Sequence, residues 1–305
     1  MDERELASGP LENAVRLTGG TQNILLRFRR GEREFVLRRP SAALREVGGK
    51  TIAREARMLK ALAGSRVPHA GLVAACDDEA VLGAKFYLME PVDGFNPNSA
   101  AGLPLPHAAD RDMRRRMGLA MVDALLCLHE LDYRAIGLDD FGRPDGFHQR
   151  QVARWLHQLE SVAGYAGWPG AGSLPGLDRL ARWLNDNCPQ RFSPGILHGD
   201  YHLSNVMFSR EGPALSAIVD WELATIGDPL MDLGNSLAYW IEADDEGPFQ
   251  MLRRQPTHRP GMLTRKEVVD YYMEKSGFRA EKFDFYEIYG LFRLAVIIQQ
   301  IYYRF

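Results

Sequence analysis

Apolar segments enclose the feature that most constrains this chain, a polar loop that runs from His198 to Asn205. Ile196-Leu197 precedes the loop and Val206-Met207-Phe208 follows it, which is typical of a loop held between two buried strands. A further apolar segment, Ala217-Ile218-Val219, leads directly into Asp220-Trp221-Glu222. The pattern predicts two acid-bearing loops that leave neighbouring strands and converge, and loops on such scaffolds commonly carry function.

The polar residues of these loops follow the order Asp, Asn, Asp. Asn205 comes five positions after Asp200, and Asp220 comes fifteen positions after Asn205. Transfer of a phosphoryl group needs one carboxylate to accept the proton of the attacking hydroxyl. It also needs an amide and a second carboxylate to hold magnesium against the phosphates. The order and spacing therefore indicate phosphoryl-transfer chemistry.

The same loop contains a second pattern, His198-x-Asp200-x-His202, which is compatible with a metal hydrolase. Such a site needs further histidine or carboxylate ligands at compatible positions, and the sequence offers no second histidine pair. This interpretation also leaves Asn205 and Asp220 without a purpose. A serine hydrolase is disfavoured because the sequence contains no GxSxG.

The composition is that of an ordinary globular protein with 305 residues, of which 46% are hydrophobic. This length suits one large domain or two lobes. The net charge of -3 with 25% charged residues gives no support to nucleic-acid binding. Arginines cluster between Arg27 and Arg39 and between Arg111 and Arg116, and such runs are usually solvated faces. Part of the first cluster could instead face the phosphates of a nucleotide.

Cysteine usage and the chain ends favour a cytoplasmic protein. Three cysteines form neither a CxxC pair nor a zinc spacing, which favours reduced thiols. The start, Met1-Asp2-Glu3-Arg4-Glu5, does not have the pattern of a signal peptide. Leu291 to Tyr303 is the most apolar late stretch, but Arg293 and two glutamines interrupt it, so we expect a buried helix and no membrane association. The sequence leaves the oligomeric state open.

The N-terminal part has the alternation of antiparallel strands over residues 14–17, 23–28 and 34–38, with Gly31 at a turn. Ile52, Ala56, Leu59 and Leu62 recur at helical intervals and predict an amphipathic helix. Two more strands are expected, at Leu72 to Cys76 and at Lys85 to Glu90.

Pro91 to Pro97 is rich in residues that break regular structure and predicts a boundary between two lobes, residues 1–91 and 92–305. Beyond it the periodicity becomes helical, first with Met117, Met121, Leu125 and Leu128 on one face. Later helices are expected at Val152 to Leu159, Lys266 to Lys275 and Tyr286 to Tyr303. Loops are expected at Gly164 to Gly176 and at Glu246 to Gly261.

The motif segments together resemble the aminoglycoside phosphotransferase family, the kinase-like group that includes choline and homoserine kinases. The segments are Leu197 to Val206, Ile218 to Ala224 and Gly227-Asp228-Pro229-Leu230-Met231-Asp232-Leu233. Their Asp-Trp-Glu and Gly-Asp-Pro-Leu wording is most similar to the phosphotransferase modules found beside some acyl-CoA dehydrogenases. The resemblance implies an α+β, protein-kinase-like fold with a small antiparallel-sheet N-lobe and a mainly helical C-lobe. It also implies magnesium-dependent transfer of the γ-phosphoryl group of ATP, or of GTP, to a hydroxyl of a small molecule.

The same resemblance assigns roles to individual residues. Asp200 would be the catalytic base, with His198 bracing its loop. Asn205 and Asp220 would bind magnesium, while Asp228 and Asp232 would stabilise the segment after the metal site. The nucleotide-binding positions would be Gly19 and Gly20 of the glycine loop, Arg38 and its helix partner Glu55, and Glu90 and Val92 of the hinge that meets adenine.

Two features depart from the protein-kinase pattern. The loop from Thr18 to Asn23 is not GxGxxG, although its paired glycines can still bring backbone amides close to phosphate. Arg38 stands where protein kinases have lysine, which keeps the charge but changes the geometry. A nucleotide-binding regulatory module with little turnover is therefore an alternative. The presence of Asp200, Asn205 and Asp220 together favours an enzyme.

The acceptor is the part of the reaction that the sequence leaves open. Asp244, Asp245 and Glu246 could line an acidic pocket for an aminoglycoside or an amino alcohol, or they could form a solvated loop. The modules beside acyl-CoA dehydrogenases instead point to hydroxyacyl thioesters. The family resemblance alone does not imply antibiotic resistance.

Overall fold

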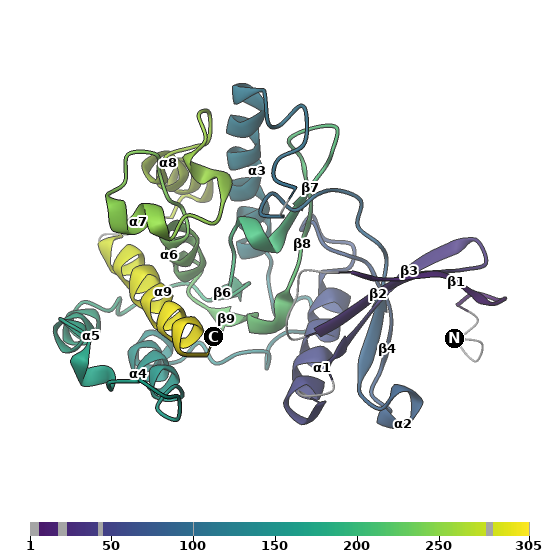
Figure 1. Ribbon diagram of the computed structural model, residues 1–305, viewed down its shortest axis with the longest axis horizontal. Helices are drawn as coiled ribbons and strands as arrows, with labels where there is room; N and C mark the ends of the chain where they lie inside the picture. Colours follow the sequence, from purple (N-terminus) through teal and green to yellow (C-terminus); the bar gives the residue numbers. More distant parts are fainter. Residues whose placement is uncertain (1–5, 18–22, 42–44, 100, 279–282, 305) are drawn as a thin grey trace.

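The structure, a computed structural model of the chain, describes residues 6–17, 23–41, 45–99, 101–278 and 283–304. It has two lobes (Figure 1). The N-terminal lobe is a sheet with one long helix, and the C-terminal lobe is mainly helical. The predicted two-lobed α+β architecture is thereby confirmed.

Five antiparallel strands form the N-lobe sheet in the order β1-β2-β3-β5-β4. Their bounds are Leu11–Leu17 (β1), Asn23–Arg30 (β2), Arg33–Pro40 (β3), Leu72–Cys76 (β4) and Phe86–Met89 (β5). Gly31 in the turn between β2 and β3 has φ +57°, a conformation that glycine adopts without steric cost. All the predicted strands are present, and β1 begins earlier than predicted.

Helix α1, Arg45–Leu62, packs against this sheet, and a short helix α2, Glu79–Leu82, joins β4 to β5. Ile52, Leu59 and Leu62 are buried on one face of α1, as the periodicity predicted. Burial of such a side chain typically stabilises the fold by about 1.5–3 kcal/mol. Glu55 lies among them and is 1% exposed, so the helix carries one carboxylate into the interior.

Seven helices make up most of the described C-lobe. They are α3 Arg111–His129, α4 Phe147–Glu160, α5 Leu177–Asp186, α6 Leu230–Ala238, α7 Gly247–Met251, α8 Arg265–Ser276 and α9 Asp284–Arg304. Helices α8 and α9 confirm the two late helices. The segment expected to be a loop at Glu246 to Gly261 contains α7 and a 3-10 turn, Pro256–His258, and we did not predict α5 or α6. None of the helices in the described ranges combines the length and apolar character that a membrane crossing requires.

Helices α6 and α9 pack closely because glycines lie at their crossing. A Cβ on Gly290 would lie 2.3 Å from the carbonyl oxygen of Gly234, and a Cβ on Gly234 would lie 2.2 Å from that of Tyr286. Any larger side chain would force the two backbones apart. This contact places the next turn of α9, which contains the buried Arg293, deep inside the C-lobe.

Two small strand pairs carry the motif loops. β6 (Gly195–Leu197) pairs with β9 (Thr225–Gly227), and β7 (Val206–Phe208) pairs with β8 (Leu215–Ile218). The segment between β5 and α3 reaches this region, since Phe95 and Phe208 exchange two backbone hydrogen bonds of 2.9 Å. Ile218 N–H also donates to Pro68 O of the N-lobe at 2.8 Å. The boundary at residues 91 and 92 stays a prediction, and it falls in this connecting segment.

Candidate active site

The buried side chain of His198 fixes the loop from His198 to Asn205. Nε2 of His198 lies 2.9 Å from Val219 O, and Nδ1 accepts a hydrogen bond from Asp200 N–H at 3.2 Å. This pattern requires one protonated nitrogen, and burial lowers the pKa of His198, so its ring is neutral. His198 is fully buried, and its ring therefore joins the two motif loops.

Two buried carboxylates support the same region. Asp232 accepts hydrogen bonds from His198 N–H at 2.5 Å and Gly199 N–H at 2.9 Å. Asp228 accepts from Tyr286 Oη–H at 2.6 Å and from Leu230 N–H at 3.1 Å, at the start of α6. Asp232 therefore reaches back to the loop of Asp200, and Asp228 ties the start of α6 to α9.

Asp200 lies at the centre of a cluster of polar side chains. Its Oδ1 accepts from Arg293 Nη2 at 2.8 Å, and its Oδ2 accepts from Asn205 Nδ2 at 3.0 Å. His202 Nε2 lies 3.4 Å from the same Oδ2. Burial alone would raise the pKa of Asp200, but His202 and Arg293 hold it well below its usual range. The carboxylate is therefore ionised and held in one orientation.

A second cluster lies between β3, α1, β5 and the loop after β8. Arg38 Nη2 donates to Glu55 Oε1 at 2.8 Å and to Asp220 Oδ1 at 2.6 Å. Tyr87 Oη donates to the other oxygen of Glu55 at 2.8 Å. Burial opposes the charge on Arg38, but Glu55 and Asp220 keep the pKa of its guanidinium above the ordinary value. The arginine therefore forms with Glu55 the ion pair that the resemblance implied, and it reaches Asp220 as well.

The two clusters meet at Asn205 and Asp220, whose side-chain oxygens could bind a cation. Asn205 O accepts from Val219 N–H at 2.9 Å, which joins the backbones of the two motif loops. The Nδ2 group of Asn205 is bound to Asp200, so its amide oxygen is available as a ligand. Asp220 has φ +67°, an uncommon conformation for a non-glycine residue and one found near active sites. Amide and carboxylate oxygens are suitable ligands for magnesium, so these residues fit the ion.

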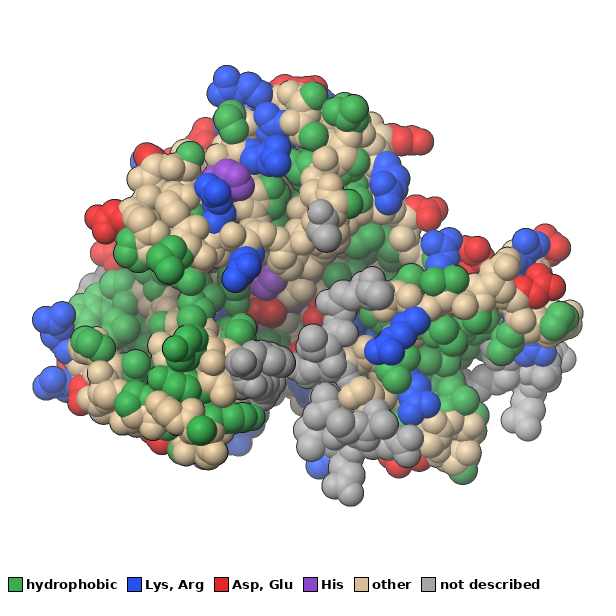
Figure 2. Space-filling model, in the orientation of Figure 1, with side chains coloured by type: hydrophobic (Ala, Val, Ile, Leu, Met, Phe, Trp, Pro, Cys, Tyr) green, Lys and Arg blue, Asp and Glu red, His purple; other side chains and the backbone are tan. Residues whose placement is uncertain are grey.

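Glu222 is a site residue to which we assigned no role from the sequence. Its carboxylate and those of Glu55 and Asp220 offer oxygens within 4.8 Å of one another. Burial, then the charges of Asp220 and Glu55, raise the pKa of Glu222 to about 7. Figure 2 shows acidic side chains in the hollow between the lobes. Such a concentration of negative charge favours a bound cation.

Of the remaining predicted positions, the structure describes Glu90 and Val92. Glu90 N–H donates to Gly71 O at 2.8 Å at the end of β5, and Val92 is half-buried in the connecting segment. Gly19 and Gly20 fall outside the described residues. The roles proposed for these four residues stay predictions.

The geometry does not support the metal-hydrolase interpretation of His198-x-Asp200-x-His202. Both ring nitrogens of His198 face backbone groups. His202 is likewise engaged, because its Nε2 lies near Asp200 and its Nδ1 accepts from Ser204 N–H at 3.2 Å. Among the described residues, the only group with metal-ligand geometry is made of carboxylates.

Two residues that contact the loop from His198 to Asn205 lie far from it in the chain, and we did not predict a role for them. Arg293 is on α9, and Gln255 Oε1 accepts from Leu203 N–H at 3.2 Å. The charge of Arg293 within an apolar helical stretch was the one available signal.

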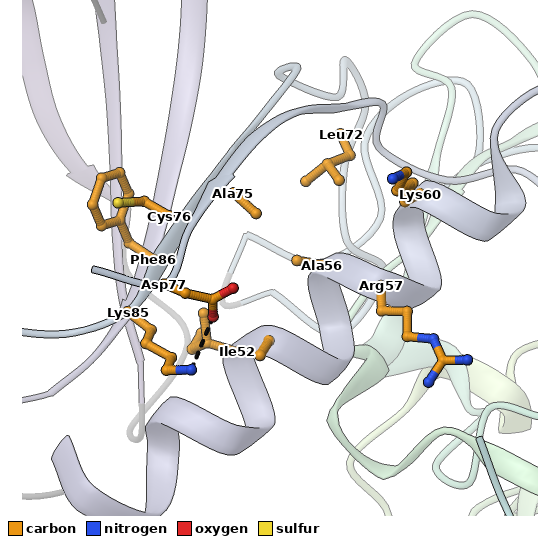
Figure 3. A pocket seen from close by; sticks show the side chains of 11 residues that line it. Ile52, Ala56, Arg57, Lys60, Leu72, Ala75, Cys76, Asp77, Lys85 and Phe86 are labelled. Carbon is orange, nitrogen blue, oxygen red and sulfur yellow. Dashed lines mark hydrogen bonds and ion pairs between the residues drawn. The ribbon is translucent and has the colours of Figure 1, made fainter. Parts of the chain in front are cut away.

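A cavity of about 270 Å³ lies elsewhere in the N-lobe, between α1 and β4 (Figure 3). Apolar side chains such as Ile52 and Leu72 line it, together with the Asp77–Lys85 ion pair. It contains none of the residues that we predicted for the site.

Comparisons with known proteins agree with this geometry. Residues 13–267 match the model of the phosphotransferase enzyme family (APH). The chain is 31% identical over 305 residues to acyl-CoA dehydrogenase family member 10 of Mus musculus, covering 98% of the chain but 27% of that protein.

Solved structures show the same relationship. A Ralstonia eutropha protein assigned to the aminoglycoside phosphotransferases is 30% identical, with a TM-score of 0.78 over 98% of this chain and 85% of that one. The GDP complex of aminoglycoside 2'-phosphotransferase-IIIa is 15% identical, with a TM-score of 0.63 over 98% and 86%, and it shares the fold. The chain therefore belongs to the phosphotransferase enzyme family, and its fold is kinase-like.

Proposed function

We propose that this phosphotransferase moves the γ-phosphoryl group of ATP, or of GTP, to a hydroxyl of a small molecule. The observation that carries the proposal is the junction of the two motif loops. There, Asp200 and Asn205 are hydrogen-bonded to each other, and the Asn205–Val219 backbone bond brings the loop of Asp220 alongside. These three side chains, two carboxylates and one amide, are of the types that phosphoryl transfer requires.

In the proposed reaction, the acceptor oxygen forms a bond to the γ-phosphorus while the bond to the bridging oxygen of the leaving diphosphate breaks. Asp200 orients the hydroxyl and takes its proton, which then passes to solvent. An ionised carboxylate with a low pKa suits this role, since a loose transition state needs alignment more than a strong base.

Arg38 contacts Asp220, one of the two proposed metal ligands. With Glu55 holding one side of its guanidinium, it would contact the phosphates of the nucleotide. Asn205 and Asp220 would hold magnesium, which when bound neutralises charge on the phosphates. Glu90 and Val92 would meet the base of the nucleotide, and Gly19 and Gly20 its phosphates.

One observation supports the regulatory alternative. Arg38 lies 2.6 Å from Asp220, the carboxylate proposed as a magnesium ligand. A module that kept this ion pair with nucleotide bound would bind the nucleotide without transferring its phosphate. Nucleotide binding without product formation would therefore favour the alternative.

The deciding experiment measures magnesium-dependent release of ADP or GDP and the mass of the phosphorylated product. The acceptor panel contains aminoglycosides, amino alcohols and hydroxyacyl thioesters, because the relatives are named for aminoglycoside phosphotransferases and acyl-CoA dehydrogenases. Asp200→Asn should lower kcat by about 10²–10⁴-fold with nucleotide affinity unchanged. Asp178→Asn, an exposed change on α5, is the control. Substantial turnover by Asp200→Asn would contradict the assigned role.

A further inference from the structure

Arg293 is a buried cation beside the proposed catalytic carboxylate. Its side chain is 3% exposed, and Nη2 lies 2.8 Å from Asp200 Oδ1. The guanidinium carbon lies 5.1 Å from the centroid of the Trp155 ring, whose Nε1–H donates to Tyr289 Oη at 2.7 Å. The glycine contact between α6 and α9 sets the depth of this turn of α9. Arg293 is therefore held rigidly, by packing on several sides.

The two oxygens of Asp200 have different surroundings. Oδ2 faces Asn205 and His202, and Asn205 is joined to the loop of Asp220, where the metal and nucleotide are proposed to bind. Oδ1 faces Arg293. An acceptor hydroxyl that approaches Asp200 from the side away from the nucleotide therefore meets the arginine.

A guanidinium has five N–H donors in a planar fork. Among the described residues, Arg293 makes one hydrogen bond, the one to Asp200. Its other donors lie in a poorly solvated place, where a negative group is bound more strongly than in water. Arg293 can thus hold Asp200 and a second anionic group together.

Of the three acidic residues expected at the rim of a pocket for a cationic acceptor, the half-buried Asp245 is neutralised, and Asp244 and Glu246 are exposed. Asp245 accepts from both Nη atoms of Arg265 at 2.6 and 2.5 Å, and also from Glu242 N–H at 2.7 Å. This carboxylate therefore has its partner within the fold. A cationic acceptor would gain little from it and would be repelled by Arg293.

Basic residues lie instead on the segment that touches the catalytic loop. Gln255 Oε1 accepts a hydrogen bond from Leu203 N–H at 3.2 Å. Gln255 Nε2 lies 3.2 Å from His202 Nδ1. Arg253 and Arg259 flank Gln255 in the chain, and burial together with their charges lowers the pKa of His258. Figure 2 shows Lys and Arg side chains on the C-lobe around α3 and α8. Arginines therefore lie within four positions of Gln255, the residue through which this segment contacts the loop of Asp200.

We propose that the acceptor is an alcohol that carries a carboxylate or phosphate group, and that Arg293 binds this group while Asp200 orients the hydroxyl. The inference rests on the proposed phosphoryl transfer at Asp200. It names the acceptor class that the charges around that residue favour.

The test uses four small alcohols: glycerol, glycerate, glycerol 3-phosphate and choline. Acceptor-dependent ADP release is measured at saturating magnesium-ATP for the wild type, Arg293→Gln and Arg293→Lys. The wild type should use at least one anionic alcohol roughly tenfold or more better than glycerol in kcat/KM, the scale of one charge-assisted hydrogen bond. Glycerate and glycerol 3-phosphate distinguish a carboxylate from a phosphate.

Arg293→Gln should remove this preference, mainly through KM, and Arg293→Lys should keep part of it. Nucleotide affinity should change much less than KM for the anionic alcohols, because Arg293 contacts Asp200 and, within the described part of the chain, none of the proposed metal or nucleotide ligands. The preference of the wild type for anionic over neutral and cationic alcohols tests the proposal even if Arg293→Gln does not fold. Arg66→Gln, which removes an exposed arginine paired with Glu130, is the matched control.

Three results would overturn the proposal: preference for choline, no stimulation by either anionic alcohol, or equal losses for glycerol and the anionic alcohols in Arg293→Gln. The last result would make Arg293 a support for Asp200 alone. Failure of the proposed function looks different, because the wild type would then release no ADP with any acceptor, including those of the wider panel.

Discussion

The two sides of the candidate site are built in different ways. On the nucleotide side, Arg38 forms ion pairs with both Glu55 and Asp220. All three residues lie in segments that the family resemblance identified. On the acceptor side, Asp200 depends on Arg293, which is distant in sequence and is placed by the packing of α9 on α6. The geometry at Asp200 therefore depends on the packing of one helix, whereas the three charged groups of the nucleotide side hold one another directly.

The largest effect is expected on the free energy of unfolding, when the buried ion pair of Arg38 and Glu55 on the nucleotide side is broken. Glu55→Ala would leave Arg38 buried with only Asp220, and would remove the acceptor for Tyr87 Oη–H. Breaking a buried pair in this way costs about 3–5 kcal/mol, so the free energy of unfolding should fall by that amount. Chemical denaturation of the wild type and the variant measures it.

The double variant Arg38→Met/Glu55→Leu separates stability from function. Apolar replacement of a buried pair is often neutral or stabilising, so this variant should regain much of the lost stability. It should not regain nucleotide affinity, because the cation is gone. Recovery of nucleotide binding in the double variant would show that Arg38 does not contact the nucleotide.

Asp220→Asn should weaken magnesium binding without disturbing the fold. Asp220→Asn keeps a side chain that tolerates positive φ but removes a charge, so the backbone at φ +67° should be retained. Magnesium-dependent nucleotide affinity should fall by about 10–100-fold or more, because mutation of residues that only support metal ligands already causes a loss of that size. Titration of nucleotide at several magnesium concentrations measures this, with Asp112→Asn as an exposed control. Unchanged magnesium dependence would remove Asp220 from the metal site.

Much of the nucleotide side could be predicted because the segments that resemble the family include Arg38, Glu55 and Asp220, although Arg38 and Asp220 lie 182 positions apart. The apolar segments around His198 to Asn205 indicated strands, and β6, β7 and β8 are present. The pairing of Arg38 with Glu55 followed from the resemblance, and the two side chains do meet. The roles assigned to these residues stay predictions.

The acceptor side could not be predicted, because Arg293 lies outside every segment that carries the family resemblance. Arg293 and Asp200 meet only because two glycines let α6 and α9 touch, which no local pattern encodes. In the same way, the sequence could not tell whether Asp245 was a free acid, since Asp245 lies in a loop and its partner Arg265 is at the start of α8. A charged residue inside an apolar helix should be regarded as a site candidate even when its partner is unknown.

The smallest expected effect is a pH dependence centred on Glu222. Its pKa is raised from 4.5 to about 7 by burial and by Asp220 and Glu55. A carboxyl with a raised pKa in the folded state favours folding while protonated, so its contribution is complete below pH 4.5 and is lost as the pH rises through 7. Glu222→Gln remains neutral, so the variant should gain on the order of 1 kcal/mol relative to the wild type between pH 5 and pH 8, a figure reduced for partial solvent exposure. Chemical denaturation without magnesium at both pH values measures this, with the exposed Glu211→Gln as the control. An equal difference between Glu222→Gln and wild type at the two pH values would mean that Glu222 titrates as an ordinary surface carboxylate.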